Sequence, residues 1–334
     1  MDRMQVLVFA VILIVLLGAA IALVSRPGGG ETQGITIRAA TLQGGISTLD
    51  LIEAYKLLGD EGYNLSVLRL QKTPDIIAAL ANNETDLAVI PAEMAGKLIQ
   101  SGQDVRIIAV EMLQNQAVLV KNDSISSPQQ LKGQLVGAVV ASGTYKMFKA
   151  YMSVVYNISV VEGETPQPDV ITVVNVPPGS ILSTLNTEQI AAVVIWEPFV
   201  SLGLAQGDRI LVSYSDLWSQ AGLSGDPVML VWVARGEFVD NHPDAVNAFI
   251  KAKDKAVQIW ETNRSATYRV LADLYKLDNQ TLDQLYQRTT SLLVTGNLTS
   301  SQVESIRNVW WLAWKGGYLE EDPATIPDTV FYQG

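Results

Sequence analysis

The stretch GQLVGAVVASGTYKMFKAYM (Gly133–Met152) decides how the chain folds, because it contains a complete strand, turn and helix. Leu135–Ala141 is a short, continuous apolar run, which is typical of a strand buried on both faces. Ser142-Gly143-Thr144 is a turn of small residues, and apolar side chains then recur at helical spacing. The stretch therefore predicts a helix that starts at the carboxyl end of a buried strand.

This predicted helix start has unsatisfied backbone N–H groups and carries about half a positive charge. Lys146 and Lys149 follow it, where Asp or Glu would usually satisfy a helix start. The N–H groups are then free to bind an anion. The alternative is that Ser142 or Thr144 only caps an ordinary helix, which is the favoured interpretation of this stretch alone.

Composition excludes several classes of function. The net charge of −11 argues against nucleic acid or an anionic membrane surface as the partner. The chain has no cysteine, which excludes disulfides, thiolate nucleophiles, zinc knuckles and iron–sulfur clusters. His242 is the only histidine and stands at a predicted helix start, so we interpret it as a surface residue. We therefore expect no catalytic residues, no cofactor and no metal.

The N-terminal residues predict the compartment. Val6–Val24 has no charged side chain and approaches the roughly 20 residues that span a bilayer. Residues 1–26 are either an uncleaved membrane anchor or a signal peptide, since Ala20-Ile21-Ala22 fits a cleavage site. Residues 27–34 (PGGGETQG) read as a flexible linker. The remainder is expected outside the cytoplasm, at the cell surface.

Asn-x-Ser/Thr sequons support this location. Chance would give about two of them at this Ser/Thr content. An Asn- and Ser/Thr-rich surface could also generate them without glycosylation. The sequons stand at Asn64, Asn83, Asn122, Asn157, Asn263, Asn279 and Asn297, and we interpret them as glycosylation sites of an exported body.

The body shows an internal repeat of strand–helix units. Ile76–Glu93 (IIAALANNETDLAVIPAE) aligns with Ile181–Pro198 (ILSTLNTEQIAAVVIWEP), with apolar positions in register. Strands alternating with helices predict α/β architecture with two doubly wound lobes. The predicted strands are Ile35–Leu42, Leu65–Leu70, Leu87–Ile90, Leu135–Ala141, Val170–Val176, Ala192–Ile195, Arg209–Leu217 and Asp226–Arg235. The predicted later helices are His242–Thr262, Ser265–Leu277, Leu282–Leu293 and Ser301–Gly317, the last with Trp310, Trp311 and Trp314 as core residues.

Four junctions follow predicted strands at the ends where such sheets bind ligands. Gln43–Ser47 and Pro91–Glu93 belong to the first lobe, and Ser142–Tyr145 and Trp196–Pro198 to the second. They predict an interlobe cleft. The first lobe is expected to comprise residues 35–120 plus 226–334 and the second residues 121–225, with hinge crossings near Leu113–Lys121 and Tyr214–Pro227.

These residues resemble the nitrate/sulfonate/taurine and NMT1/THI5-like solute receptors of ABC importers, which have the type II periplasmic-binding-protein fold. The resemblance covers about Ile35–Thr262. It is carried by Gly62–Val67, Ala78–Glu93 with Asp86, Ser127–Gly133, Ser142–Thr144, Trp196–Phe199 and His242–Val246. Ala191 stands where the second lobe of this family usually has an Asp, so contacts of that acid cannot be transferred.

The resemblance implies that both lobes close over a small solute and present it to a membrane permease. It implies a non-catalytic, monomeric receptor whose ligand contacts are Gln43, Gly44, Gly45, Ser47, Glu93, Ser142, Gly143, Thr144, Trp196 and Glu197. On the residues alone, the glycines allow close backbone approach, Ser142–Thr144 donate to an anionic group and Trp196 offers an apolar wall. Glu93 and Glu197 would either bind a cationic end or satisfy their own helices. Two acids in the cleft favour a zwitterion or a heteroaromatic base over a bare inorganic anion. The solute is therefore expected to be a small anionic or zwitterionic organic compound that contains nitrogen or sulfur.

Alternative functions remain at this stage. An anchored sensor or surface protein could keep the fold without a transporter. Pyrimidine-synthase-like enzymes and porphobilinogen deaminases share the fold, but their chemistry depends on cysteine, which this chain lacks. A LysR-type effector domain is disfavoured by the N-terminal apolar segment.

Overall fold

The computed structural model describes residues 34–334, and Thr36–Gly334 form one compact unit. The predicted membrane or signal segment at residues 1–26 lies outside the described residues, as does nearly all of the predicted linker. Within the described part of the chain, no helix is long and apolar enough to cross a bilayer.

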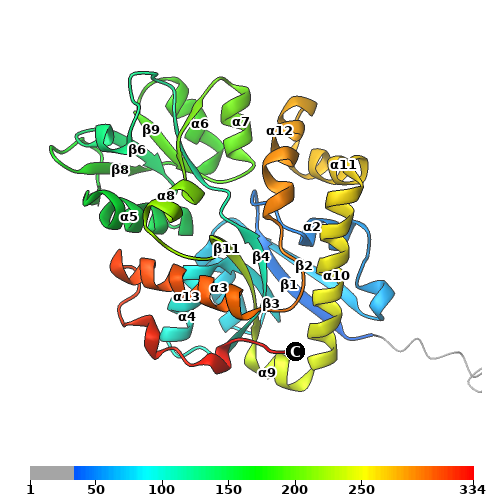
Figure 1. Cartoon of the computed structure of the whole chain (residues 1–334). Helices are drawn as coiled ribbons and strands as arrows, with labels where there is room; N and C mark the ends of the chain where they lie inside the picture. The colour runs from blue at the N-terminus through cyan, green and yellow to red at the C-terminus, as the bar shows by residue number, and fades with distance from the viewer. Residues whose placement is uncertain (1–33) are drawn as a thin grey trace, which may run out of the picture. The chain divides into compact units, whose positions relative to one another are not determined.

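The first sheet consists of β1 (Thr36–Leu42), β2 (Asn64–Leu70), β3 (Leu87–Pro91), β4 (Val105–Leu113) and β11 (Val228–Arg235). Their order is β2-β1-β3-β11-β4 (Figure 1). β1 is parallel to β2 and β3, whereas β11 runs antiparallel to β3 and β4. The connections are α2 (Leu49–Ala54), α3 (Thr73–Ala81) and α4 (Ala92–Gln100). The predicted order from β1 to α4 and the predicted strand at β11 are confirmed, whereas β4 was not predicted.

The second sheet consists of β5 (Ala117–Val120), β6 (Leu135–Ala138), β7 (Val160–Glu162), β8 (Ile171–Asn175), β9 (Ala192–Ile195) and β10 (Arg209–Ser213). Their order is β10-β5-β9-β6-β8-β7. β6 is parallel to β8 and β9, which fits its continuous apolar sequence. The helices are α5 (Gly143–Tyr156), α6 (Pro178–Asn186), α7 (Phe199–Ala205) and α8 (Tyr214–Gln220).

Three details of the second lobe differ from the sequence prediction. β7 was not predicted, because it has only a short apolar run. Arg209–Leu217 was predicted as one strand, but α8 replaces its second half, because Ser213 and Asp216 form a capping box that starts a helix. The second sheet already begins with β5, before the expected lobe boundary at residue 121.

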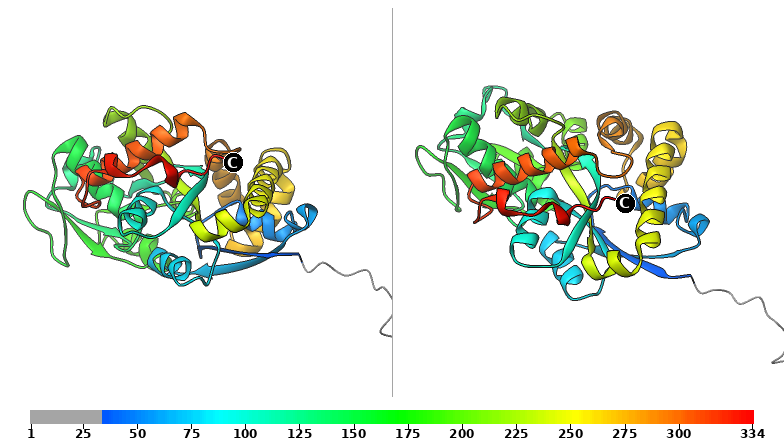
Figure 2. Two further views of the ribbon diagram at one scale, coloured as in Figure 1. Left: turned by 90° about the horizontal axis from the view of Figure 1, so that it is seen from below. Right: turned by 60° about the horizontal axis from the view of Figure 1, so that its bottom comes forward.

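The C-terminal helices are α9 (Gly236–Asn241), α10 (Pro243–Thr262), α11 (Arg264–Tyr275), α12 (Asn279–Thr289) and α13 (Ser300–Lys315). α10 packs against α2 of the first lobe, whereas α12 packs against α7 of the second. α13, orange in Figures 1 and 2, packs against both α4 and α5. Trp310 is fully buried there and stacks on Phe331, as predicted for a core residue.

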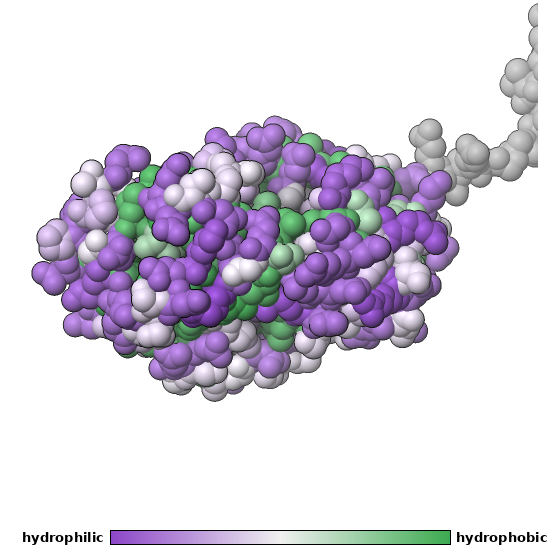
Figure 3. Space-filling model, turned by 90° about the horizontal axis from the view of Figure 1, so that it is seen from above, coloured by the Kyte–Doolittle hydropathy of each residue, from purple (hydrophilic) through white to green (hydrophobic). Residues whose placement is uncertain are grey.

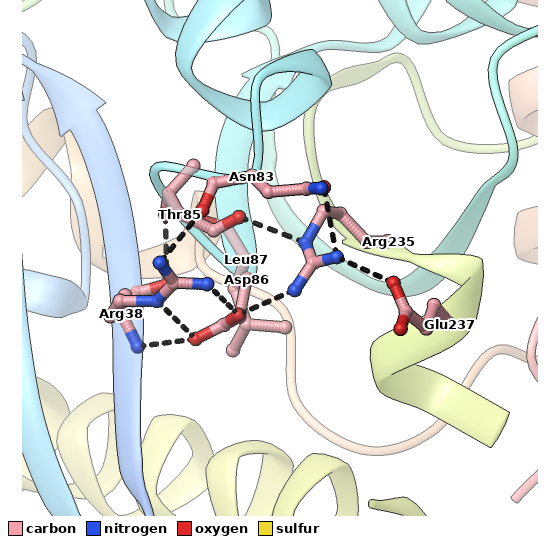
Figure 4. A network of polar contacts seen from close by, with 7 residues as sticks. All are labelled: Arg38, Asn83, Thr85, Asp86, Leu87, Arg235 and Glu237. Carbon is pink, nitrogen blue, oxygen red and sulfur yellow. Dashed lines mark hydrogen bonds and ion pairs between the residues drawn. The ribbon is translucent and has the colours of Figure 1, made fainter. Parts of the chain in front are cut away.

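Asp86 ties the first sheet together at the end opposite to the four junctions (Figure 4). Its carboxylate accepts from the Arg38 guanidinium at 2.6 Å and from the Arg235 guanidinium at 2.9 Å. Burial alone would raise the pKa of Asp86, but the two guanidinium groups outweigh that effect and lower it. This geometry gives Asp86 a structural role, because it joins β1, β3 and β11.

The apolar residues of the described chain form three buried clusters, two of which contain residues from strands of both sheets. The face in Figure 3 is mostly hydrophilic, with hydrophobic residues gathered along its middle. All seven sequon asparagines are exposed. Asn263 also caps α11 through its side-chain oxygen.

Candidate ligand-binding site

A cavity of about 50 Å³ lies between the two sheets, at the carboxyl ends of β1, β3 and β9. It is smaller than the roughly 150 Å³ that holds a benzene molecule. Most of its wall is apolar, with side chains of both lobes facing each other. The lining residues are Thr41, Leu42, Gly45, Ile46, Thr73, Ile76, Val89, Pro91, Asn115, Ser142, Gly143, Thr144, Trp196, Glu197, Met229 and Leu230.

The start of α5 supplies the polar end of the cavity. Ser142 caps the helix: its hydroxyl accepts from Tyr145 N at 3.2 Å and donates to Val139 O at 2.7 Å. Because both bonds are internal, the Ser142 hydroxyl is not free to donate to an anion, contrary to its predicted role. Among the described residues, none accepts a hydrogen bond from the backbone N–H of Gly143 or Thr144. The anion-binding capacity of this helix start therefore rests on two backbone groups.

The loop Gln43–Ser47 contributes less than predicted. Gly45 lines the cavity, but Gln43 is exposed and Ser47 accepts from Leu49 N at the start of α2. Gly44 has a φ of 84°, which favours glycine, and its carbonyl accepts from Trp196 Nε1 at 3.4 Å. The loop thus acts mainly as a contact between the lobes.

Glu93 begins α4 and lies behind Gly143 rather than on the cavity wall. Its side chain is buried, and its Oε1 has no hydrogen-bond partner in the described structure. Burial raises the pKa of Glu93 to about 8. The neutral carboxyl group therefore predominates at pH 7, which weakens its attraction for a cationic ligand end.

Glu197 follows β9 and lines the cavity with its neighbour Trp196. Its carboxylate accepts from Arg288 Nε of α12 at 2.5 Å and from Ser201 N at 3.0 Å. Burial raises the pKa of Glu197, and Arg288 opposes this shift. Because Arg288 already neutralises Glu197, the premise of two free acids in the cleft fails.

Besides several apolar lining residues, four polar residues of the site were not predicted. Thr41 and Thr73 line the cavity from the end of β1 and the start of α3, and Asn115 lies in the crossing between the lobes. Arg288 reaches Glu197 from α12. Thr41 and Thr73 could have been found from the sequence, because Thr41 lies near the end of the predicted strand Ile35–Leu42 and Thr73 follows the predicted strand Leu65–Leu70. Arg288 carries no local signal, since its partner is far away in sequence.

The arrangement fits a small ligand with one anionic oxygen-bearing group and an apolar remainder. The anionic group can accept from Gly143 N and Thr144 N, while Trp196, Met229 and Leu230 contact the apolar part. Within residues 34–334, no cluster of three or more potential ligands for a metal ion is present.

A family model described as the NMT1-like family matches residues 51–275. The taurine-binding periplasmic protein of Escherichia coli (strain K12) is 24% identical over 221 residues, which cover 65% of this chain and 64% of that protein. A putative aliphatic sulfonates-binding protein of Bacillus subtilis (strain 168) is 25% identical over 140 residues, 40% of each chain. The chain thus spans less than two thirds of the length of either relative.

Solved structures share the fold. The alkanesulfonate-binding protein SsuA of Xanthomonas axonopodis pv. citri, bound to MOPS, matches with a TM-score of 0.72 and 16% identity, over 90% of this chain and 99% of that one. The periplasmic nitrate-binding protein NrtA of Synechocystis PCC 6803 matches with a TM-score of 0.67 and 16% identity, over 90% of this chain and 86% of that one. The predicted α/β fold with two lobes is confirmed.

Proposed function

The chain belongs to the NMT1-like family, and we propose that it is the solute-binding receptor of an ABC importer, with a short aliphatic sulfonate as its solute. The observation that carries this proposal is the pair of backbone N–H groups, Gly143 N and Thr144 N, which have no acceptor among the described residues and lie at one end of a mostly apolar cavity. The names of the taurine- and sulfonate-binding relatives support it.

The size and charge of the site support this choice of solute. A sulfonate keeps its charge at all physiological pH values and can accept from both N–H groups at the helix start. The small cavity favours methanesulfonate or taurine over a larger sulfonate such as MOPS. The site holds no free carboxylate for a purely cationic solute, because Arg288 pairs with Glu197.

A thermal-shift screen tests this function. Methanesulfonate and taurine should raise the melting temperature, since a ligand that binds only the folded state stabilises it. Ethylamine and a pyrimidine serve as controls of similar size without the oxyanion. Stabilisation by these controls, with no effect of either sulfonate, would reject the proposed solute class.

A pair of variants tests the backbone donors. Thr144→Pro removes the N–H in the first turn of α5, where proline is tolerated, while Thr144→Val keeps it. We expect Thr144→Pro to weaken sulfonate binding by about tenfold or more, since a hydrogen bond to a charged group contributes about 1.5–3 kcal/mol. Equal affinity of both variants would remove Thr144 N from the site.

We also propose that the body works outside the cytoplasm with a membrane permease, as a monomer, without catalytic activity or a cofactor. Residues 1–26 would anchor or export it, and the exposed sequons would carry glycans. Mass spectrometry of the protein isolated from its native membrane fraction tests both points, through the mature N-terminus and the mass of glycopeptides. A mature chain starting at Met1 with unmodified sequons, found only in the cytoplasm, would contradict them.

A further inference from the structure

Glu93 occupies the space directly beside the helix start that binds the proposed anion. Glycine at residue 143 makes this possible, because a Cβ there would lie 2.1 Å from Glu93 Oε1. Glu93 is 2% exposed, and its Oε1 accepts no hydrogen bond in the described part of the chain. A buried, unpartnered carboxyl oxygen thus lies against the N-terminus of α5.

Apart from its own backbone N–H, which favours the charged form less than burial disfavours it, no described group compensates the charge of Glu93. Three phenols lie close enough to Glu93 for its charge to raise their pKa. They belong to Tyr151 on α5, Tyr214 on α8 and Tyr318 after α13. The Tyr151 hydroxyl donates to Gln114 Oε1 at 2.8 Å, and the Tyr214 hydroxyl donates to Thr144 O at 2.7 Å. The charged groups of the same elements face other partners: Lys97 pairs with Glu320, Lys146 faces Glu162 and Asp216 binds Ser213.

The protonation state of Glu93 therefore determines whether a negative charge lies beside the positive end of α5. With a pKa of about 8, the carboxyl group is neutral at pH 7 and leaves the positive end of α5 to a ligand. When ionised, the carboxylate is itself the anion at that helix start. A second anion in the cavity would then be repelled across a poorly hydrated space.

We propose that Glu93 is a positioning residue that makes anion binding depend on one proton: the neutral side chain admits a singly charged oxyanion, and the ionised side chain competes with it for the start of α5. This inference rests on the proposed function, since it concerns the same site. The receptor would then hold its solute at neutral pH and release it progressively at alkaline pH.

Titration calorimetry with methanesulfonate between pH 6 and pH 9.5 tests the inference, because this probe stays singly charged throughout. The affinity of the wild type should fall about 30-fold from pH 7 to pH 9.5, as expected for one proton and a pKa of about 8. Glu93→Gln mimics the neutral acid and should change less than about threefold over the same range. Glu320→Gln, an exposed carboxylate beside α4, is the matched control and should behave like the wild type.

A second measurement does not depend on the variant. Binding at pH 9, repeated in buffers of different ionisation enthalpy, should show uptake of nearly one proton by the wild type. An affinity that does not change with pH, the same decline in Glu93→Gln, or no proton uptake would each overturn the role of Glu93. Absence of methanesulfonate binding at pH 6 and pH 7 would overturn both this inference and the proposed solute class.

Discussion

The two halves of the repeat each place a buried glutamate after their third strand, yet the two residues differ in every other respect. Glu197 in the second lobe has Arg288 and Ser201 N as partners. Glu93 in the first lobe has an Oε1 without a partner in the described structure and a pKa near 8. Near-equivalent positions therefore carry a charged, paired group in one lobe and a neutral, unpaired group in the other.

The comparison shows two ways in which a buried glutamate can be kept from adding negative charge to the cleft. A paired carboxylate fixes the contact between α12 and the second lobe but offers no net charge to a ligand. A neutral carboxyl beside the start of α5 leaves the positive helix end uncompensated. Both arrangements remove negative charge from the cleft, and both thereby favour an anionic solute.

Removing the cation that pairs with Glu197 should have the largest effect on stability. Arg288→Ala leaves the buried Glu197 without a cation. Removing one partner of a fully buried pair costs about 3–5 kcal/mol of unfolding free energy, and because the Arg288 side chain is 29% exposed we expect the loss near the lower end of that range. Urea denaturation followed by tryptophan fluorescence measures this loss. Glu197→Gln in the same chain should recover part of it.

Arg264→Ala is the control for that prediction, because Arg264 and its partner Asp283 are both half-exposed. It should change stability by less than about 1 kcal/mol. If Arg288→Ala were no more destabilising than Arg264→Ala, the Glu197 pair would not be the strong contact inferred here.

Adding a methyl group beside Glu93 should have the next largest effect on stability. In Gly143→Ala, the new methyl group would meet Glu93 Oε1 at 2.1 Å and Pro91 Cβ at 2.7 Å, and such overpacking costs about 1–3 kcal/mol. Thermal denaturation measures it. Gly179→Ala, near the start of α6 with open space around the new Cβ, should be neutral or slightly stabilising, and equal losses in both variants would contradict the close contact.

Titrating the unpaired glutamate should give a graded effect, which is small for a change of one pH unit and accumulates between pH 4.5 and about pH 8. The folded pKa of about 8 lies above the ordinary value of 4.5, so the folded state keeps a proton that the unfolded state has lost. The free energy of unfolding, measured relative to Glu93→Gln, should therefore fall by about 1.4 kcal/mol per pH unit as the pH rises from about 4.5 to about 8. Denaturation curves at several pH values measure this slope, and parallel pH profiles for the two proteins would show that Glu93 is not buried as a neutral acid.

Removing the cap of α5 should have the smallest effect. Ser142→Ala loses the bond from Tyr145 N and should cost about 1 kcal/mol of stability, whereas Ser142→Asn should retain the cap. Calorimetry should find sulfonate affinity nearly unchanged, because the Ser142 hydroxyl already serves Val139 and Tyr145. A loss of affinity above tenfold would mean that this hydroxyl reaches the ligand after all.

Local patterns predicted most elements of the fold, because hydrophobic periodicity and helix starts depend on neighbouring residues. β6 and α5 followed directly from Gly133–Met152, apart from the end of the strand. The helix α8 was missed although Ser213 and Asp216 have the spacing of a capping box. The apolar residues around them had been read as a continuing strand.

The site was predicted less completely, because its chemistry depends on contacts between distant segments. The sequence identified the start of α5 and its backbone N–H groups, and it left Ser142 as either a donor to an anion or a helix cap. In the structure Ser142 caps the helix, and within residues 34–334 nothing accepts from the backbone N–H of Gly143 or Thr144. The sequence identified Glu197 but not Arg288, since only the packing of α12 against α7 brings them together. The neutral state of Glu93 depends on burial, which sequence spacing does not reveal.

The position of α13 has a mechanical consequence for the whole receptor. Two chain crossings alone would let one lobe rotate freely about the line that joins them. Trp310 of α13 donates to Ala92 O of the first lobe, while Gly316 directly after the helix lies against the backbone of Ala150 in the second. A rotation that separates the lobes must therefore shift or break these contacts of α13, which lie away from the line that joins the two crossings. The end of the chain thus connects the two lobes in addition to the crossings and to the contact of α12 with α7.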